Sequence, residues 1–245
     1  MQGNRTRRLW AALTLGVAGH TAAWAGYFPV FDTWPQPDGP GSALTLTYSF
    51  SNLLDGSLRT IGGTPLPAAT LRAAFETALQ DYTLFLPIHF VEVEDRGGPL
   101  PETGRYDPTG LADIRIGQVA AIAGANAYAY YPSSPATNGL AGDIVFNAGR
   151  GGLGWTVSLF HAVAQHELGH VLGMGHYVTT GDLPAPYDGP VYPLEPEAVA
   201  ALQAAYGAGR GSVTPLSAVP EPGPSALLLA GLAALAWRAR QRRAP

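Results

Sequence analysis

Three histidines and a glutamate lie within eleven consecutive residues, 166–176, which read HELGHVLGMGH. His166 and His170 are four residues apart, so on a helix both imidazoles project from one face and can bind the same metal ion. Gly173 lets the backbone leave that helix in a conformation closed to residues with side chains, and the turn brings His176 back as a third ligand. The spacing therefore predicts a metal site held by three imidazole nitrogens.

Glu167 follows the first of these histidines directly, so its carboxylate lies close to the metal and can act as a general base on a water there. Three neutral nitrogens leave a fourth coordination position open, as a catalytic zinc ion requires. Imidazole favours zinc-like ions over calcium, while nickel, cobalt and iron remain compatible with this ligand type. The predicted chemistry is hydrolysis without a covalent intermediate, which agrees with the lack of cysteine in the chain.

The motif and its surroundings resemble the matrixins, a family of metzincin metalloproteases. HELGHVLGMGH is close to the matrixin consensus at its variable positions too. Residues 112–114 (ADI) and 142–147 (GDIVFN) are similar to two matrixin strands, and residues 191–207 are similar to the family's methionine-turn and closing helix. The similarity covers residues 112–207 and is weaker over 42–111. It implies a zinc-dependent endopeptidase with a metzincin-like catalytic domain.

Three departures from the matrixin pattern concern the surroundings of the metal. Val191 occupies the place of the methionine that packs beneath the zinc in the family, which changes that packing without implying loss of zinc. The connection from His176 to Val191 is longer than in matrixins and should reshape the pocket for the substrate side chain. Val145 stands where many animal matrixins carry a structural-zinc histidine, so we expect one Zn²⁺. Ca²⁺ at Asp143 and Asn147 is possible, although such residues are more often part of turns.

The resemblance also suggests residues that contact the substrate. It places Tyr192 in the wall of the specificity pocket as a substrate-binding residue, with simple packing as the alternative. The family strand that corresponds to residues 127–131 pairs with the substrate backbone by strand addition. Tyr128, Tyr130 and Tyr131 are therefore candidates for the border of the cleft.

The elements that would position this site follow from hydrophobic periodicity. Strands are expected at 42–50, 88–94, 112–117, 127–131 and 143–147, and helices at 67–81, 156–172 and 195–206. Together with the resemblance, they predict an α+β fold with a twisted mixed sheet of about five strands, an active-site helix and a C-terminal helix. His161 lies some 140° around its helix from the ligand face and His89 lies in an alternating strand, so both are expected to be structural or supporting.

The two ends of the chain have the composition of targeting segments. Residues 1–25 combine a basic start, an apolar run and Ala23-Trp24-Ala25, which predicts a signal peptide cleaved after Ala25. Its apolar run is too short for a membrane-spanning helix of ~20 residues. Residues 220–245 hold Pro-Glu-Pro, an apolar stretch at 225–237 and an arginine cluster, and resemble the PEP-CTERM sorting signal of Gram-negative bacteria. That resemblance implies processing by an exosortase and delivery to the cell envelope or extracellular matrix. The alternative is a short membrane anchor held by the arginines. For the sorting signal, transient membrane contact through the C-terminal segment is expected.

The body between these segments, residues 26–219, has the size of one domain. It contains 17 acidic residues and 7 arginines, hence a net charge of −10. This balance argues against a nucleic-acid partner, because phosphate neutralisation needs clustered basic residues. Without cysteine, the exported domain must be stabilised by its core and by metal.

The function predicted from these features is a secreted zinc-dependent endopeptidase acting on protein or peptide substrates. One alternative is a catalytically impaired, zinc-stabilised binding or matrix protein of the cell envelope, because the methionine of the turn is missing. Another is an amidase or glycan-acting zinc enzyme, which the spacing of the motif and the Tyr192-Pro193 pair downstream make less favourable.

Overall fold

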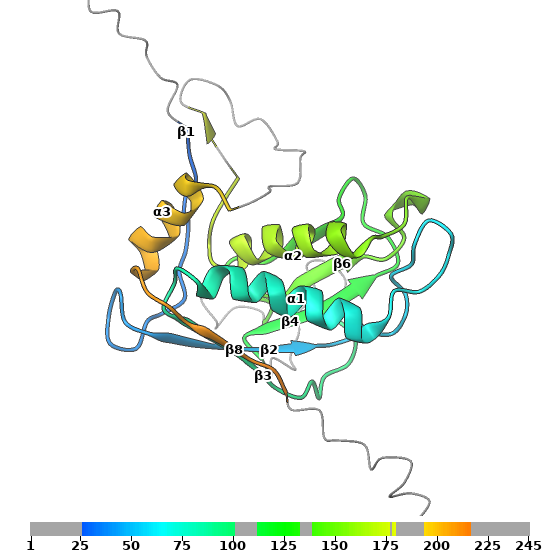
Figure 1. The fold of residues 1–245 in the computed structure, drawn as a ribbon, viewed down its shortest axis with the longest axis horizontal. Coiled ribbons are helices and arrows are strands. Elements are labelled where there is room, and N and C mark those ends of the chain that lie inside the picture. Colours follow the sequence, from blue (N-terminus) through cyan, green and yellow to red (C-terminus); the bar gives the residue numbers. More distant parts are fainter. Residues whose placement is uncertain (1–25, 101–111, 133–138, 177, 180–193, 217–245) are drawn as a thin grey trace, which may run out of the picture.

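The computed structural model describes residues 26–100, 112–132, 139–176, 178–179 and 194–216. Its centre is a six-stranded mixed sheet with helices α1 and α2 packed side by side on one face, while α3 lies at one end of the molecule near β1 (Figure 1). The elements are β1 (Gly26–Tyr27), β2 (Leu44–Phe50), α1 (Ala68–Thr83), β3 (Ile88–Glu92), β4 (Ile114–Val119), β5 (Ala127–Ala129), β6 (Ile144–Asn147), the 3₁₀ helix η1 (Arg150–Gly152), α2 (Val157–Val171), β7 (Val178–Thr179), α3 (Pro196–Tyr206) and β8 (Ser212–Thr214).

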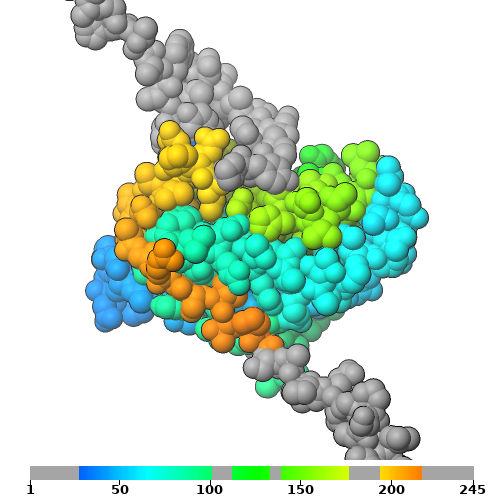
Figure 2. Space-filling model, in the orientation of Figure 1, coloured from blue at the N-terminus to red at the C-terminus, as the bar shows by residue number. Residues whose placement is uncertain are grey.

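The strand order of the sheet is β5-β6-β4-β2-β3-β8. All neighbouring strands are parallel except β5, which runs antiparallel to β6 at one edge. The predicted α+β class and mixed sheet are confirmed, and the predicted elements are found close to their expected bounds. The sheet has one strand more than expected, because β8 adds to its other edge beside β3. In Figure 2 the segment containing β8 lies against α1 at the edge of the domain.

The core fills the space between the sheet and the two long helices. The buried face of α1 carries the residues at helical spacing, including Leu71, Phe75 and Leu79, and α2 is buried on most of its circumference. Thr156 caps the start of α2, since its hydroxyl accepts a hydrogen bond from the backbone N–H of Leu159 at 3.1 Å. Trp155, directly before this cap, is buried and donates its indole N–H to the carbonyl of Asn147 at the end of β6. The start of the metal-binding helix is thus fixed against the sheet.

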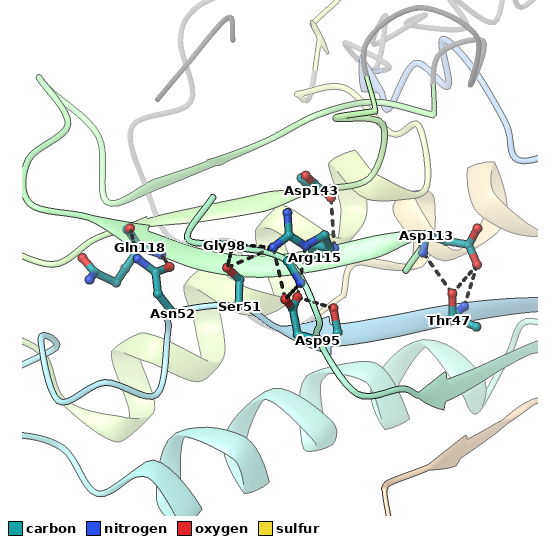
Figure 3. A network of polar contacts seen from close by, with 11 residues as sticks. Thr47, Ser51, Asn52, Asp95, Gly98, Asp113, Arg115, Gln118 and Asp143 are labelled. Carbon is teal, nitrogen blue, oxygen red and sulfur yellow. Dashed lines mark hydrogen bonds and ion pairs between the residues drawn. The ribbon is translucent and has the colours of Figure 1, made fainter. Parts of the chain in front are cut away.

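A polar network holds the other face of the sheet together (Figure 3). Arg115 of β4 is 1% exposed and donates from Nε to Asp95 at 3.0 Å and from Nη2 to the carbonyl of Gly98 at 2.6 Å. Burial raises the pKa of Asp95, but the hydrogen bonds from Arg115 and Ser49 outweigh this and leave the pKa below its ordinary value. A carboxylate of Asp143 accepts from the backbone N–H of Arg115, which ties β6 to β4.

Several predictions concern residues outside the described ranges. They are the signal peptide at 1–25, the sorting signal at 220–245, Val191 and Tyr192. In the described part of the chain, no helix is long and apolar enough to cross a membrane.

Candidate metal centre

The structure brings together the three histidines of the motif at the C-terminal end of α2 and in the turn that follows. The Nε2 atom of His170 lies 3.1 Å from Nε2 of His166 and 3.1 Å from Nε2 of His176. One nitrogen from each of the three rings falls within 4.8 Å of the others. Among the described residues, this is the one group of three or more histidine or acidic side chains with a geometry suited to a metal ion.

The chemistry of this donor set fits a zinc-like cation. A tetrahedral zinc ion about 2.05 Å from each nitrogen separates the nitrogens by about 3.3 Å, close to the spacing seen here. His170 Nδ1 donates to the carbonyl of Met174 at 2.7 Å, which leaves a lone pair on Nε2 for the metal. Burial lowers the pKa of His166 to about 3 and that of His170 to about 4, with the neighbouring histidines adding to both shifts. The rings of His166 and His170 are therefore neutral at physiological pH, as metal ligation requires.

Glu167 is buried beside these ligands without a complete set of partners. It is 4% exposed, and its Oε2 atom has no hydrogen-bond partner among the described residues. Burial raises the pKa of its carboxyl group to about 8, and a cation beside it would lower that value and favour the ionised form. A buried carboxylate oxygen that lacks a partner indicates a place for a water or an ion.

The turn after α2 is held by the N-terminal strap, residues Phe28–Trp34. The backbone N–H of Phe31 donates to the carbonyl of Gly173 at 2.9 Å, and that of Gly175 donates to the carbonyl of Pro29 at 2.7 Å. Gly173 has φ +86°, and a Cβ atom there would lie 1.7 Å from the carbonyl oxygen of Asp32. Glycine at this position therefore provides both the left-handed backbone and the room for the strap.

Two buried aromatic side chains complete the end of α2. The indole N–H of Trp34 donates to the carbonyl of Val171 at 2.9 Å, and the hydroxyl of Tyr206 in α3 donates to the carbonyl of Leu172 at 3.1 Å. They satisfy carbonyl groups that have no partner within the helix. Residues from both ends of the domain thus position the turn that carries His176.

Two hollows flank the histidines. One has a volume of about 200 Å³, and its lining includes the apolar side chains of Phe28, Met174 and Leu194. The other has a volume of about 400 Å³ and runs along β5; it is bordered by Tyr128 and Tyr131, by Glu167 and by the three histidines. We call this second hollow the β5 cleft. Tyr130, the third candidate tyrosine, is not among its lining residues.

The remaining candidate residues have local partners. Asn147 donates from Nδ2 to the carbonyls of Ile122 and Ala125, and its Oδ1 accepts from the backbone N–H of Arg150. These contacts occupy the side-chain amide of Asn147 at the end of β6, and calcium binding at Asp143 and Asn147 stays a prediction. Val145 is buried in β6.

His89 and His161 are not part of the group formed by the three histidines. His161 lies 3.2 Å from a carboxylate oxygen of Asp81, and His89 contacts the hydroxyl of Ser212 at 2.9 Å. Both contacts link neighbouring elements of the fold, as expected for structural residues.

Sequence reasoning missed the strap and did not distinguish Tyr131 from its neighbours. The opening segment 27–41 is rich in proline and glycine, a composition typical of irregular structure, and no strand or helix was predicted there. The available signal was the cluster of four aromatic residues in this segment, Tyr27, Phe28, Phe31 and Trp34. The structure shows one consequence of the contact, since a Cβ atom at Gly175 would lie 2.4 Å from the ring of Phe31.

Two comparisons with known proteins gave matches to this chain. Residues 218–243 match the family model described as PEP-CTERM protein-sorting motif, which indicates export and sorting to the bacterial cell surface. An alignment of 161 positions that covers 58% of this chain shows 32% identity to human matrix metalloproteinase-19. It spans 27% of the length of that relative. The chain is therefore a matrixin-like protein with a PEP-CTERM sorting motif at its C-terminus.

Proposed function

We propose that this protein is a zinc-dependent endopeptidase exported to the cell surface. The observation that carries the proposal is the convergence of three imidazole nitrogens beside a buried carboxylate with an unpartnered oxygen. His166, His170 and His176 would hold the metal, and Glu167 would be the catalytic residue. The similarity to a matrix metalloproteinase supports the same class of reaction.

The chain's own residues provide the proton transfers of peptide hydrolysis. When bound, zinc supplies a Lewis acid for the scissile carbonyl and lowers the pKa of a water beside it. Glu167 accepts the proton of the attacking water on its unpartnered Oε2 atom and passes it to the leaving amine. The ring of His170 keeps its orientation because its Nδ1 atom donates a hydrogen bond to the carbonyl of Met174.

Strand β5 gives the substrate a place to bind. It lies at the edge of the sheet, and its residues border the β5 cleft together with residues of α2 and the three histidines. An extended peptide can add to such an edge through backbone hydrogen bonds. The apolar hollow at Phe28, Met174 and Leu194 would accept a side chain of that peptide. Tyr192 remains a predicted substrate-binding residue.

The terminal segments complete the proposal. A signal peptide at 1–25 would direct export, residues 26–219 would form the protease domain, and residues 220–245 would be read by an exosortase-type processing enzyme. The sorting-motif match supports the last step. A Gram-negative cell envelope or extracellular matrix would be the destination.

A peptidase assay with casein or a quenched peptide library tests the catalytic proposal. Cleavage should stop with a chelator and return with zinc. Glu167→Gln should retain the metal and lose about 10²- to 10⁴-fold in rate, whereas Glu197→Gln, an exposed residue at the start of α3, should cleave normally. Metal binding without cleavage by the unaltered protein would favour the binding or matrix protein instead.

A further inference from the structure

Tyr131 lies beyond the end of β5, in the cleft beside the histidines. Its ring contacts that of His170 edge to face, with 5.6 Å between the ring centroids. The side chain is 36% exposed and borders the same hollow as Glu167. Among the described residues, its hydroxyl group has no hydrogen-bond partner. The phenol is therefore a polar group of the cleft that the fold itself does not use.

Phe31 of the N-terminal strap supports this ring from another side. The ring centroids of Phe31 and Tyr131 are 5.7 Å apart and the ring planes are nearly perpendicular, at 81°. Phe31 is 68% exposed, yet its backbone is fixed by the hydrogen bond to Gly173. Edge-to-face contacts of this kind stabilise a particular ring orientation. Phe31, Tyr131 and His170 thus form a row of rings from the strap to a metal ligand.

The neighbouring tyrosine is placed differently. Tyr130 does not border the β5 cleft, and its ring contacts Tyr128 with 5.7 Å between centroids. Its backbone exchanges hydrogen bonds with Asp143 and Gly142 next to β6. Adjacent residues of the same type therefore have different surroundings, and Tyr130 provides a matched control for Tyr131.

We infer that the hydroxyl group of Tyr131 is a substrate-contacting donor, which hydrogen-bonds the scissile carbonyl oxygen as that oxygen gains negative charge. The inference rests on the proposed function, because it requires a peptide carbonyl in the cleft. A phenol hydroxyl group is a hydrogen-bond donor, and no covalent bond to Tyr131 forms or breaks. A donor held in place before the reaction stabilises developing charge without reorganisation.

Binding of a phosphinic pseudopeptide to the full chain tests this role without requiring turnover. The probe carries a tetrahedral, negatively charged phosphinate in place of the peptide unit between a glycine and a leucine residue. Calorimetry with the zinc-loaded protein would compare Tyr131→Phe, which removes only the hydroxyl group, with Tyr130→Phe. Absorption spectra of the cobalt-substituted proteins would report separately on the three histidines.

Tyr131→Phe should weaken phosphinate binding about 10- to 100-fold and leave the cobalt spectrum unchanged, while Tyr130→Phe should bind within about twofold of the unaltered protein. Equal binding by Tyr131→Phe and the unaltered protein would overturn the inference and leave the proposed function intact. An altered cobalt spectrum in Tyr131→Phe would also overturn the inference, since Tyr131 would then act by holding His170 in place. If the unaltered, metal-loaded protein does not bind the phosphinate, the proposed function fails as well.

Discussion

Replacement of Gly173 by alanine should disrupt the metal site without touching a metal ligand. The new Cβ atom would lie 1.7 Å from the carbonyl oxygen of Asp32, whereas carbon and oxygen atoms approach no closer than about 3.3 Å. The strap and the turn must then separate by about 1.6 Å. The two backbone hydrogen bonds between them, at 2.9 and 2.7 Å, cannot survive such a shift.

The expected cost has two parts. Alanine with φ near +86° costs about 1 kcal/mol in backbone strain, and the two lost hydrogen bonds cost about 1 kcal/mol each. The free energy of unfolding of the metal-free protein should therefore fall by about 3 kcal/mol. Because the same shift displaces His176, zinc affinity should fall about 10- to 100-fold, as for other groups that orient metal ligands.

Gly151→Ala provides the matched control. Gly151 also has positive φ, at +59°, but a Cβ atom there would have no neighbour within 4 Å. The free energy of unfolding of this variant should fall by only about 1 kcal/mol, and its zinc affinity should stay unchanged. Urea unfolding with and without chelator, together with zinc titration against a competing chelator, measures both quantities. If the two alanine variants behave alike, the strap does not position the third ligand and the reasoning is wrong.

Three further predictions concern stabilisation by zinc, the ion pair between Asp95 and Arg115, and strand β8 near the C-terminus. Free zinc at 1,000 times its dissociation constant should raise the free energy of unfolding by about 4 kcal/mol relative to the metal-free protein, as measured by urea unfolding. The metal-free protein should still fold, because its hydrophobic core does not include the three histidines. Asp95→Asn should lower the free energy of unfolding by about 3 kcal/mol at pH 7, because it removes the carboxylate that accepts a hydrogen bond from Nε of the buried Arg115. Since the pKa of Asp95 lies below its ordinary 3.8, its stabilisation is present above that pH and is lost as the pH falls through the lowered value, so the deficit should shrink in unfolding curves recorded at successively lower pH below 3.8. A chain ending at residue 217 should melt at the same temperature as the full chain, whereas one ending at 211 should melt lower, because it loses β8 and the hydrogen bond from Leu216 to Glu92.

Most of the fold could be predicted because its elements bury periodic faces. Leu71, Phe75 and Leu79 recur at helical spacing, and the structure buries all three in α1. Strand β8 shows no such pattern, since it has only three residues and two of them are exposed. Its place is set by backbone pairing with β3, which leaves no trace in residue type. Short edge strands of this kind are hard to infer from one sequence.

Only the part of the candidate site that lies within one helix could be predicted from the sequence. His166, Glu167 and His170 are related by the geometry of one helix, so their spacing is enough to place them on adjacent positions. The partners that hold the turn come from distant parts of the chain: Trp34 is 137 residues from Val171, whose carbonyl it binds. No periodicity connects such residues.

Gly173 shows why the motif alone does not define the site. In the sequence this glycine has one evident role, a backbone conformation that releases the chain from α2. The structure adds a second role, because the strap passes so close that any Cβ atom would collide with Asp32. A chain with the same motif but without a docked strap would keep His166 and His170 on one helix face and lack the contacts that hold the turn before His176. The position of the third ligand is therefore a property of the tertiary fold, and the first two are properties of the helix.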